Sequence, residues 1–326
     1  SYNLMNSSFL FMNIKDIKAW IITEGMIGTQ NQCLGVAEAL GITPIVKQVS
    51  LHQPWKTLTP WLGFEQSFTF TEPLTPPWPD LLIASGRKAV AASRYIKKKS
   101  GGKTFTVQIQ DPKCSSKNFD LVAVPHHDTL RGANVVVNHG APNRITSTTL
   151  ETARSEFEIQ FSVLPSPRIA VLIGGNSRTH KLTPDIMLNL VSQLKVLNGH
   201  LMITASRRTG DENLKILQDG LRDTNTFIWD GTGKNPYHAM LAWADHILVT
   251  ADSVSMISDA ATTGKPVHII PLEGHSPRFD RFHAHMQKIG AARPFNGNLQ
   301  NWSYEPLNDA KMVADAIEQA MQKRYG

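Results

Sequence analysis

The sequence Ile-Ala-Val-Leu-Ile-Gly-Gly-Asn-Ser-Arg-Thr-His-Lys-Leu-Thr-Pro occupies residues 169–184 and joins three local signals. Its five leading apolar residues predict a buried strand, and the glycine pair after them predicts a tight loop. Thr183 and Pro184 are typical of a helix N-cap and of the first position inside a helix. A buried strand that leads through a glycine loop into a capped helix is typical of a parallel sheet covered by helices.

The same alternation of apolar runs and helical patterns extends in both directions from this stretch. After it we expect strands 201–205, 227–229, 246–250 and 267–270, with helices 184–197, 211–221, 237–244 and 255–263. Before it we expect strands 19–23, 45–49, 81–85, 105–109, 121–124 and 135–138, with helices 30–40 and 88–98. The sequence therefore predicts an α/β protein with two tandem doubly wound, Rossmann-like domains that face each other across a cleft.

The length of the chain also fits two domains, because its 326 residues are about twice the usual domain size. Two prolines within residues 164–168 interrupt both helix and central strand, so we place the domain boundary there. We expect a poorly ordered leader over residues 1–13, an N-terminal domain over 14–160, a C-terminal domain over 168–305 and a helix over 306–326. The last helix is amphipathic and is expected to pack back across the domains.

The composition excludes several classes of protein. Hydrophobic residues make up 41% of the chain and charged residues 18%, which is typical of a globular protein and not of a coiled coil or a disordered chain. The net charge of +6 is spread along the chain, so we expect no nucleic-acid partner, although acidic small ligands or a peripheral place on an anionic membrane remain consistent with it. The two cysteines, Cys33 and Cys114, form no disulfide framework, which indicates the cytoplasm.

Loops that follow the strands of the second half carry the strongest chemical signal. Gly174 and Gly175 would let backbone N–H groups approach an anion, and the arginines after this strand and the next would add planar contacts to phosphate. Of Arg207 and Arg208, one is expected to be a solvated surface charge. The residues predicted to bind phosphate are Gly174, Gly175, Asn176, Ser177, Arg178 and Arg207.

Two further loops of the same half extend this site. Ser253 and Ser255 lie where a helix begins, so they would cap the helix or hold a phosphate at its positive end. Asp259, about one turn later, would accept hydrogen bonds from a ribose diol. Trp229 and Gly231 would recognise a base, although a glycine-rich connector explains their loop equally well. A nucleotide diphosphate fits the four loops together best.

The first half of the chain has strand-end loops that would suit an acceptor. The acceptor-side candidates in these loops are Glu24, Gly25, Gly28, Ser85 and Arg87. The candidates for a general base are Asp111, His127 and Asp128. For the neighbouring His126 and His139, an ordinary polar loop residue is an equally good explanation.

Known cofactor and metal motifs are absent from the sequence. Residues 102–104 imitate the end of a P-loop, but Lys97 stands where that motif requires glycine. His283 and His285 would point to different faces of a helix, which argues against a metal site with Asp280. We therefore expect no metal and no cofactor, with a nucleotide-diphosphate sugar as the donor substrate.

Four short motifs resemble a known family. Residues 23–28 with Gln32, residues 108–112, residues 124–128 and residues 250–256 resemble the plant mitochondrial-fission Elm family and its bacterial relatives, and the likeness runs from about residue 19 to residue 295. That family is similar to two-domain, GT-B-type glycosyltransferases, so the resemblance implies this fold and adds Gln32 to the acceptor-side residues. Residues 258–267 are similar to the donor-binding signature of GT-B transferases, in which a glutamate usually holds the ribose. Asp259 takes that position with a shorter reach.

These inferences favour a GT-B-like glycosyltransferase. It would move a sugar from a nucleotide-diphosphate sugar to an acceptor such as a cell-envelope glycan or lipid, without an obligatory metal. A nucleotide-sugar epimerase of the same fold is the nearest alternative. A non-catalytic adaptor related to fission factors is the alternative from another class. The expected location is the cytoplasm, including the inner face of the membrane.

Overall fold

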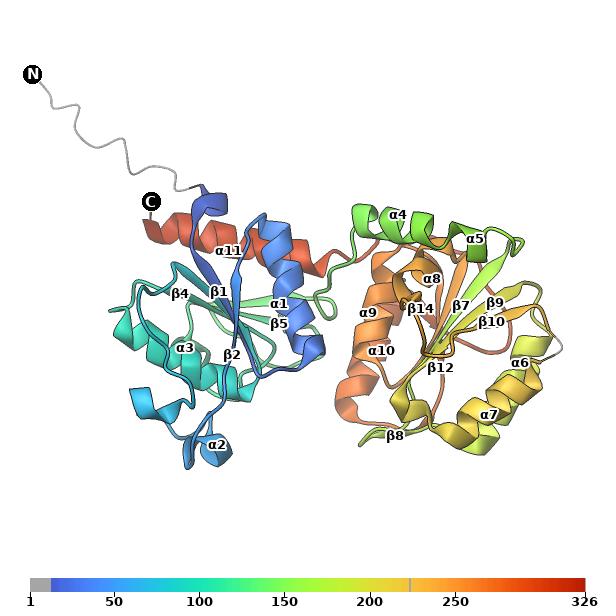
Figure 1. Cartoon of the computed structure of the whole chain (residues 1–326), viewed down its shortest axis with the longest axis horizontal. Coiled ribbons are helices and arrows are strands. Elements are labelled where there is room, and N and C mark those ends of the chain that lie inside the picture. Colours follow the sequence, from blue (N-terminus) through green and yellow to red (C-terminus); the bar gives the residue numbers. More distant parts are fainter. Residues whose placement is uncertain (1–12, 223, 326) are drawn as a thin grey trace, which may run out of the picture. The chain divides into compact units, whose positions relative to one another are not determined.

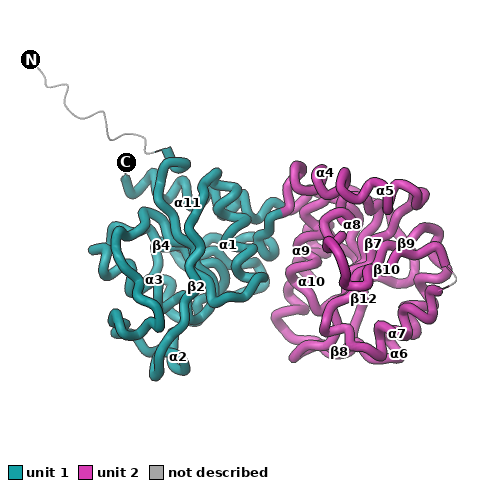
Figure 2. The backbone as a smooth tube through the Cα atoms, viewed as in Figure 1, with its two compact units in different colours: residues 1–144, 308–326 teal, residues 145–307 magenta. Residues whose placement is uncertain are grey.

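The computed structural model describes residues 13–222 and 224–325, which fold into two compact units (Figure 2). Unit 1 comprises residues 1–144 and 308–326, and unit 2 comprises residues 145–307. Of the predicted leader over residues 1–13, only Asn13 lies within the described part of the chain. Residues 145–160, which we expected in the N-terminal domain, lie in unit 2 because Ile145 and the helix after it pack into the core of that unit.

Unit 1 is a six-stranded parallel sheet in the order β2-β1-β3-β4-β5-β6 (Figure 1). Its strands are β1 (Ala19–Thr23), β2 (Ile45–Gln48), β3 (Leu81–Ser85), β4 (Phe105–Ile109), β5 (Leu121–Pro125) and β6 (Val135–Asn138). Its helices are α1 (Ile27–Leu40), α2 (Trp55–Leu58), α3 (Arg87–Lys99) and α11 (Asp309–Tyr325). The central strands are buried along their whole length because helices cover both faces of the sheet.

Unit 2 repeats this plan with a parallel sheet in the order β10-β9-β7-β11-β12-β14. Its strands are β7 (Arg168–Ile173), β9 (His200–Ala205), β10 (Thr226–Ile228), β11 (His246–Thr250), β12 (Val267–Ile270) and β14 (Ala292–Pro294), with the small antiparallel pair β8 (His180–Lys181) and β13 (Glu273–Gly274). Its helices are α4 (Ser147–Glu156), α5 (Glu158–Phe161), α6 (Pro184–Lys195), α7 (Asp211–Gly220), α8 (Tyr237–Trp243), α9 (Val254–Thr262) and α10 (Pro277–Lys288). The predicted α/β fold with two doubly wound sheets is confirmed.

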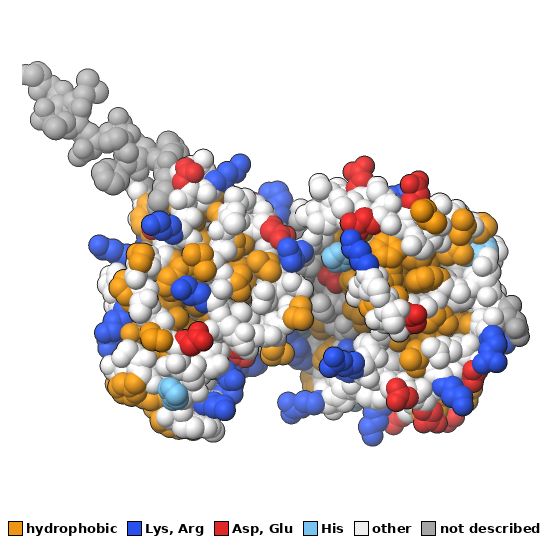
Figure 3. Space-filling view, viewed as in Figure 1, with side chains coloured by type: hydrophobic (Ala, Val, Ile, Leu, Met, Phe, Trp, Pro, Cys, Tyr) orange, Lys and Arg blue, Asp and Glu red, His pale blue; other side chains and the backbone are white. Residues whose placement is uncertain are grey.

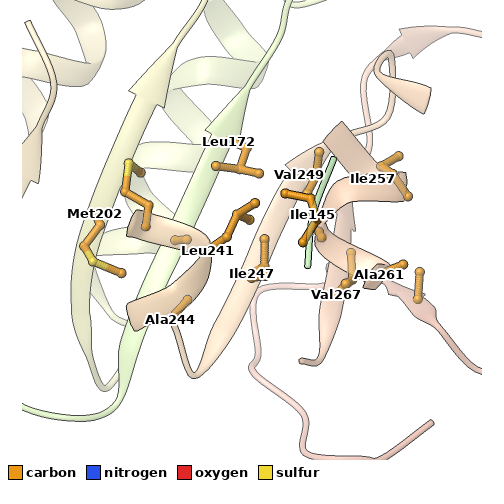
Figure 4. Close-up of a cluster of buried hydrophobic side chains, with 14 of the residues drawn as sticks. Ile145, Leu172, Met202, Leu241, Ala244, Ile247, Val249, Ile257, Ala261 and Val267 are labelled. Carbon is orange, nitrogen blue, oxygen red and sulfur yellow. The ribbon is translucent and has the colours of Figure 1, made fainter. Parts of the chain in front are cut away.

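The core of unit 2 shows how the strands hold its helices. Leu172 of β7, Val249 of β11 and Leu241 of α8 belong to one buried cluster, which Ile257 of α9 completes (Figure 4). These residues come from the apolar runs that the sequence pattern assigned to strands and helices. Thr183 also acts as predicted, since its hydroxyl oxygen accepts the Ile186 N–H at 3.1 Å and begins α6. These contacts fix the strands and helices that carry the loops at the carboxyl edge of the sheet.

Helices α4 and α5 were not predicted, because their segment is mostly polar and only Ala153 of α4 and Phe161 of α5 are buried. Helix α11 was predicted and belongs to unit 1, where it packs against α1. Every helix among residues 13–222 and 224–325 is too short or too polar to cross a lipid bilayer.

A buried histidine of unit 2 makes stability depend on pH. His268 of β12 is fully buried, accepts the Gln300 N–H at 3.1 Å and contacts the Trp302 ring, and burial lowers its pKa to about 4. Below pH ~6.5 His268 is protonated in the unfolded state but stays neutral in the folded state. The free energy of unfolding should therefore fall by about 2–3 kcal/mol between pH ~6.5 and ~4. Urea titrations at several pH values measure this slope. His268→Gln should flatten it, whereas His52→Gln at an exposed position should leave it unchanged.

Candidate nucleotide-binding site

The predicted donor residues gather at the carboxyl edge of the sheet in unit 2. The strand order reverses between β7 and β11, so the loops that leave these two strands lie at the switch point of the sheet, where ligands of open α/β sheets bind. The loop after β7 carries the glycine pair, and the loop after β11 leads into α9. The loop after β9 lies beside them and brings its arginines to the same edge.

Both glycines of the pair are required by close contacts within the protein. Gly175 has φ +145°, and a Cβ there would lie 2.1 Å from the Arg208 carbonyl oxygen. A Cβ at Gly174 would lie 2.4 Å from the Asp252 carboxylate. The loop after β7 is therefore packed tightly between the loops of β9 and β11.

Asp252 connects these three loops. Its Oδ2 atom accepts the Gly175 N–H at 3.0 Å and pairs with Arg208 Nη1 at 2.5 Å. The Asp252 side chain is fully buried, and its Oδ1 atom has no hydrogen-bond partner among the described residues. The Gly175 N–H, which was predicted to donate to a phosphate, thus donates to a carboxylate of the protein itself.

Sequence reasoning missed Asp252 as a functional residue. An acidic residue just before a helix N-cap was visible in the loop after residues 246–250, but its partner Gly175 lies 77 positions away. The structure also distinguishes the two arginines. Both side chains are exposed, but Arg208 pairs with Asp252, whereas Arg207, which we had assigned to phosphate, forms no such ion pair among the described residues.

The polar residues after the glycine pair mainly hold their own loop. The Asn176 Oδ1 atom accepts the Leu182 N–H at 3.0 Å, and Ser177 Oγ accepts the His180 N–H at 3.2 Å. Arg178 is exposed. All three residues are exposed, and among the described residues Arg178 is the one of the three whose side chain has no hydrogen bond or ion pair.

Helix α9 follows β11, so its N-terminus lies at the same switch point of the sheet. Ser253 is its N-cap, and the Ser253 hydroxyl oxygen accepts the Met256 N–H at 3.1 Å. Ser255 is exposed in the first turn. The first N–H groups of a helix lack intrahelical acceptors and carry partial positive charge, so this end favours an anion.

Asp259, the predicted ribose ligand, is held by the partly buried Tyr237. The Tyr237 hydroxyl at the start of α8 donates to Asp259 Oδ2 at 2.7 Å. Burial and the nearby Asp259 carboxylate raise the pKa of Tyr237 well above its ordinary value, so the phenol stays protonated and remains a donor. Tyr237 is a second residue that sequence reasoning missed, and it fixes the orientation of Asp259.

The predicted base-binding loop borders an open pocket of about 410 Å³. Trp229 lines it together with Phe157 and Phe227, and the Lys234–Glu156 ion pair at 2.5 Å lies at its wall. The Trp229 indole donates to the Thr232 carbonyl oxygen at 2.9 Å. Gly231 has φ +86° and shapes the exposed turn of this loop, so its role here is conformational.

The buried His180 and the partly buried His283 lie near the loop that follows β11. The His283 Nε2 atom is 2.8 Å from the Ala251 carbonyl oxygen, and the His180 ring lies 4.9 Å from the Phe279 ring. Burial lowers the pKa of both histidines. Throughout the described part of the chain, no three His, Cys, Asp or Glu side chains are grouped as a metal site requires.

The acceptor-side candidates in unit 1 divide into two kinds. Glu24 accepts the Lys88 N–H at the start of α3, and Arg87 Nη1 donates to the carbonyl oxygens of Lys56 at 3.0 Å and Thr59 at 3.1 Å, so these two charges shape the edge of the unit. The other candidates are Gly25 and Gly28, which are exposed, and Gln32 and Ser85, whose buried Oε1 and Oγ atoms lack hydrogen-bond partners among the described residues. Within this second group, Gly25 and Gly28 are the residues that a ligand can reach, because the Gln32 and Ser85 atoms are buried.

The three candidates for a general base differ in access. Asp111 follows β4 and is partly exposed, with its Oδ1 atom accepting the Lys113 N–H at 2.8 Å. His127 is fully buried, and Asp128 is 6% exposed. The flanking Gln110 holds a left-handed φ of 74°, a conformation that is costly for a residue other than glycine. Asp111 is therefore the candidate that a substrate can reach in this structure.

Comparisons with known proteins agree with this fold. The family model described as Mitochondrial fission ELM1 matches residues 27–321. Mitochondrial fission protein ELM1 of Arabidopsis thaliana is 27% identical to this chain and covers 94% of it and 92% of that protein. UDP-GlcNAc 2-epimerase from Methanocaldococcus jannaschii, in complex with UDP-GlcNAc and UDP, aligns with a TM-score of 0.53 and 14% identity over 95% of this chain and 100% of that one. Arabidopsis thaliana UGT89C1 complexed with UDP aligns with a TM-score of 0.52 and 11% identity over 94% of each chain.

Proposed function

Because this chain belongs to the mitochondrial fission ELM1 family and has a GT-B fold, we propose that unit 2 binds a nucleotide-diphosphate sugar and that the protein transfers the sugar to an acceptor bound by unit 1. The observation that carries the proposal is the meeting of Arg208, the glycine loop and the N-terminus of α9 at the switch point of the sheet. The similar solved structures hold UDP or UDP-GlcNAc, so uridine nucleotides are the first ligands to test.

The diphosphate would lie between Arg208 and the first turn of α9. Arg208 is about half exposed on its side chain, so its planar fork has room for phosphate oxygens while one nitrogen stays on Asp252. The N–H groups of Val254 and Ser255 would face the same oxygens. Arg178 would approach from the loop after β7. Positive charge on three sides stabilises the diphosphate as it leaves.

The nucleoside would extend from this point toward α8. Asp259, oriented by Tyr237, would accept hydrogen bonds from the ribose diol. The base would lie toward Trp229, which lines the pocket beside β10. Phosphate, ribose and base would each contact the loop that the sequence pattern assigned to it.

In unit 1, the acceptor would lie over the glycines after β1 and the unpartnered Gln32 and Ser85 atoms. Asp111 would take the proton of the acceptor hydroxyl as that oxygen bonds to the anomeric carbon. The bond between the anomeric carbon and the phosphate oxygen breaks at the same time, and its electron pair leaves with the nucleoside diphosphate. In this proposal the buried Asp128 and His127 do not contact the acceptor; they support the carboxyl edge of the unit 1 sheet. Cys33 and Cys114 are free thiols, which fits the cytoplasmic location we propose.

Isothermal calorimetry with UDP and with its 2′,3′-dideoxy analogue tests the nucleotide site. We expect Asp259→Ala to weaken UDP binding about tenfold, which corresponds to about 1.4 kcal/mol for one charge-assisted contact. The dideoxy analogue lacks the diol, so its affinity should be the same for both proteins. Asp219→Ala, an exposed aspartate of α7, is the matched control. Equal losses for both nucleotides would remove the ribose contact from the proposal.

Two alternatives are separated by further readouts. An epimerase would convert the sugar of UDP-GlcNAc without releasing free UDP, whereas transfer releases UDP. A non-catalytic adaptor is favoured by the Asp252 carboxylate, which already satisfies the Gly175 amide and Arg208 as a ligand anion would. Absence of any nucleotide binding, together with a folded protein, would support the adaptor.

A further inference from the structure

One segment of unit 1 exposes large apolar side chains that the sugar-transfer proposal does not use. We define the aromatic loop as residues 55–70, which contain α2 and the turns after it. The exposed fractions of its apolar side chains are 47% for Leu58, 72% for Trp61, 84% for Phe64 and 65% for Phe68. Single exposed apolar residues are common, but four within one short excursion mark an interaction surface.

The aromatic loop is held firmly from beneath. Arg87 donates to two of its backbone carbonyl oxygens, and the Trp55 indole donates to the Gly63 carbonyl oxygen at 2.9 Å. The Arg94–Glu65 ion pair at 2.6 Å fixes its far side to α3. These contacts therefore hold the backbone under the exposed apolar side chains, and the loop need not change its conformation before it binds.

Basic side chains surround the aromatic loop. Helix α3, on which the loop rests, carries six basic residues and no acidic one. A pocket of about 370 Å³ is lined by Phe64 together with Lys97, Lys98 and Lys117. The two carboxylates at this place, Glu65 and Asp120, pair with Arg94 and with Lys97. Figure 3 shows hydrophobic and basic side chains next to one another over the part of unit 1 where Figure 1 places α2.

We propose that the aromatic loop and the lysines beside it dock on an anionic lipid bilayer. Tryptophan and phenylalanine rings favour the boundary between headgroups and acyl chains, and lysines gain energy near anionic headgroups. A protein partner fits this surface less well, because the cores of protein interfaces are depleted in lysine. Arg87 begins α3 at the carboxyl edge of the unit 1 sheet, whereas Lys97 lies near the end of this helix and pairs with Asp120, just before β5. The docking surface therefore runs along α3 from one edge of the sheet toward the other. The proposal stands whether or not the protein transfers a sugar.

Co-sedimentation of the full chain with vesicles tests the proposal. We expect binding to phosphatidylcholine vesicles that contain about 30% phosphatidylglycerol, much weaker binding to phosphatidylcholine alone, and loss of binding as salt rises from ~0.1 M to ~0.5 M. The double variant Trp61→Gln, Phe64→Gln should lower the partition coefficient at least tenfold. Lys98→Gln, Lys117→Gln should lower it on the anionic vesicles only. Ile159→Gln, at a position of unit 2 that is 86% exposed, is the matched control.

Tryptophan fluorescence tests whether Trp61 is the residue that inserts into the bilayer. Brominated lipids should quench the tryptophan emission of the native chain, and Trp61→Phe should remove that quenching while vesicle binding is kept. Native-like thermal melting of each variant shows that the fold is intact. Failure of the native chain to bind anionic vesicles would overturn the proposal. So would vesicle binding that Trp61→Gln, Phe64→Gln leaves unchanged, or self-association in solution that this double variant abolishes.

Discussion

Nucleoside diphosphate binding is expected to fall about 100-fold when Arg208 is replaced by alanine, which corresponds to about 2.7 kcal/mol. The loss follows from the geometry, because within the described part of the chain Arg208 is the arginine that forms an ion pair with the loop between β11 and α9. A hydrogen bond to a charged group contributes about 1.5–3 kcal/mol, and a diphosphate offers the guanidinium two such bonds. Calorimetric titration with UDP measures the change. Arg208→Lys should keep part of the affinity, since it retains the charge without the planar fork.

Arg207→Ala is the matched control for this prediction. It removes the same group one residue earlier, where the guanidinium forms no ion pair with the loop between β11 and α9 among the described residues, and should leave the affinity unchanged. A second comparison separates phosphate contact from structural damage, because Arg208→Ala leaves the buried Asp252 carboxylate without its cation. In the double variant Arg208→Ala, Asp252→Asn that unpaired charge is gone. Binding restored by the second substitution would show that Arg208 acts only by holding Asp252, and the diphosphate contact would have to be withdrawn.

Local signals were enough to predict all six strands of the unit 1 sheet and five of the six strands of the large sheet of unit 2, whereas β14 and the β8–β13 pair were not expected. β7 was expected over residues 169–173 and spans Arg168–Ile173, and β11 was found within its expected bounds. Buried parallel strands are continuous apolar runs, and Thr183 with Pro184 marks the start of α6 through chemistry confined to a few residues. Such features depend on neighbours in sequence, so sequence alone identifies them.

Contacts between distant segments could not be predicted. The loops of the glycine pair and of Asp252 were each recognised, yet nothing in either loop indicates that the carboxylate binds the Gly175 amide and Arg208. The orientation of Asp259 by Tyr237 is a contact of the same kind. The candidate site was therefore predicted as a set of loops, and its electrostatics became visible only when the structure brought those loops together.

Helix α11 shows that the fold of unit 1, like the candidate site, depends on contacts between segments that are distant in sequence. Val313, Ile317 and Met321 of α11 lie in one buried cluster with residues of α1, although the whole of unit 2 intervenes in the sequence. The helix begins at Asp309, which is 4% exposed and accepts the His139 N–H at 3.0 Å and the Gly140 N–H at 2.9 Å. One carboxylate thus attaches the returning chain to the loop after β6.

Asp309→Ala is accordingly expected to lower the free energy of unfolding of unit 1 by about 3 kcal/mol, because two backbone amides lose this charged acceptor. For a unit of this size the midpoint of thermal unfolding should fall by about 6–12 °C. Asp315→Ala removes a carboxylate six residues later on the same helix, where it forms an exposed pair with Lys311 at 2.8 Å, and should change stability by less than about 0.5 kcal/mol. Circular dichroism during urea and thermal unfolding compares the two variants. Equal and small changes would mean that apolar packing against α1 alone holds the C-terminal helix in unit 1.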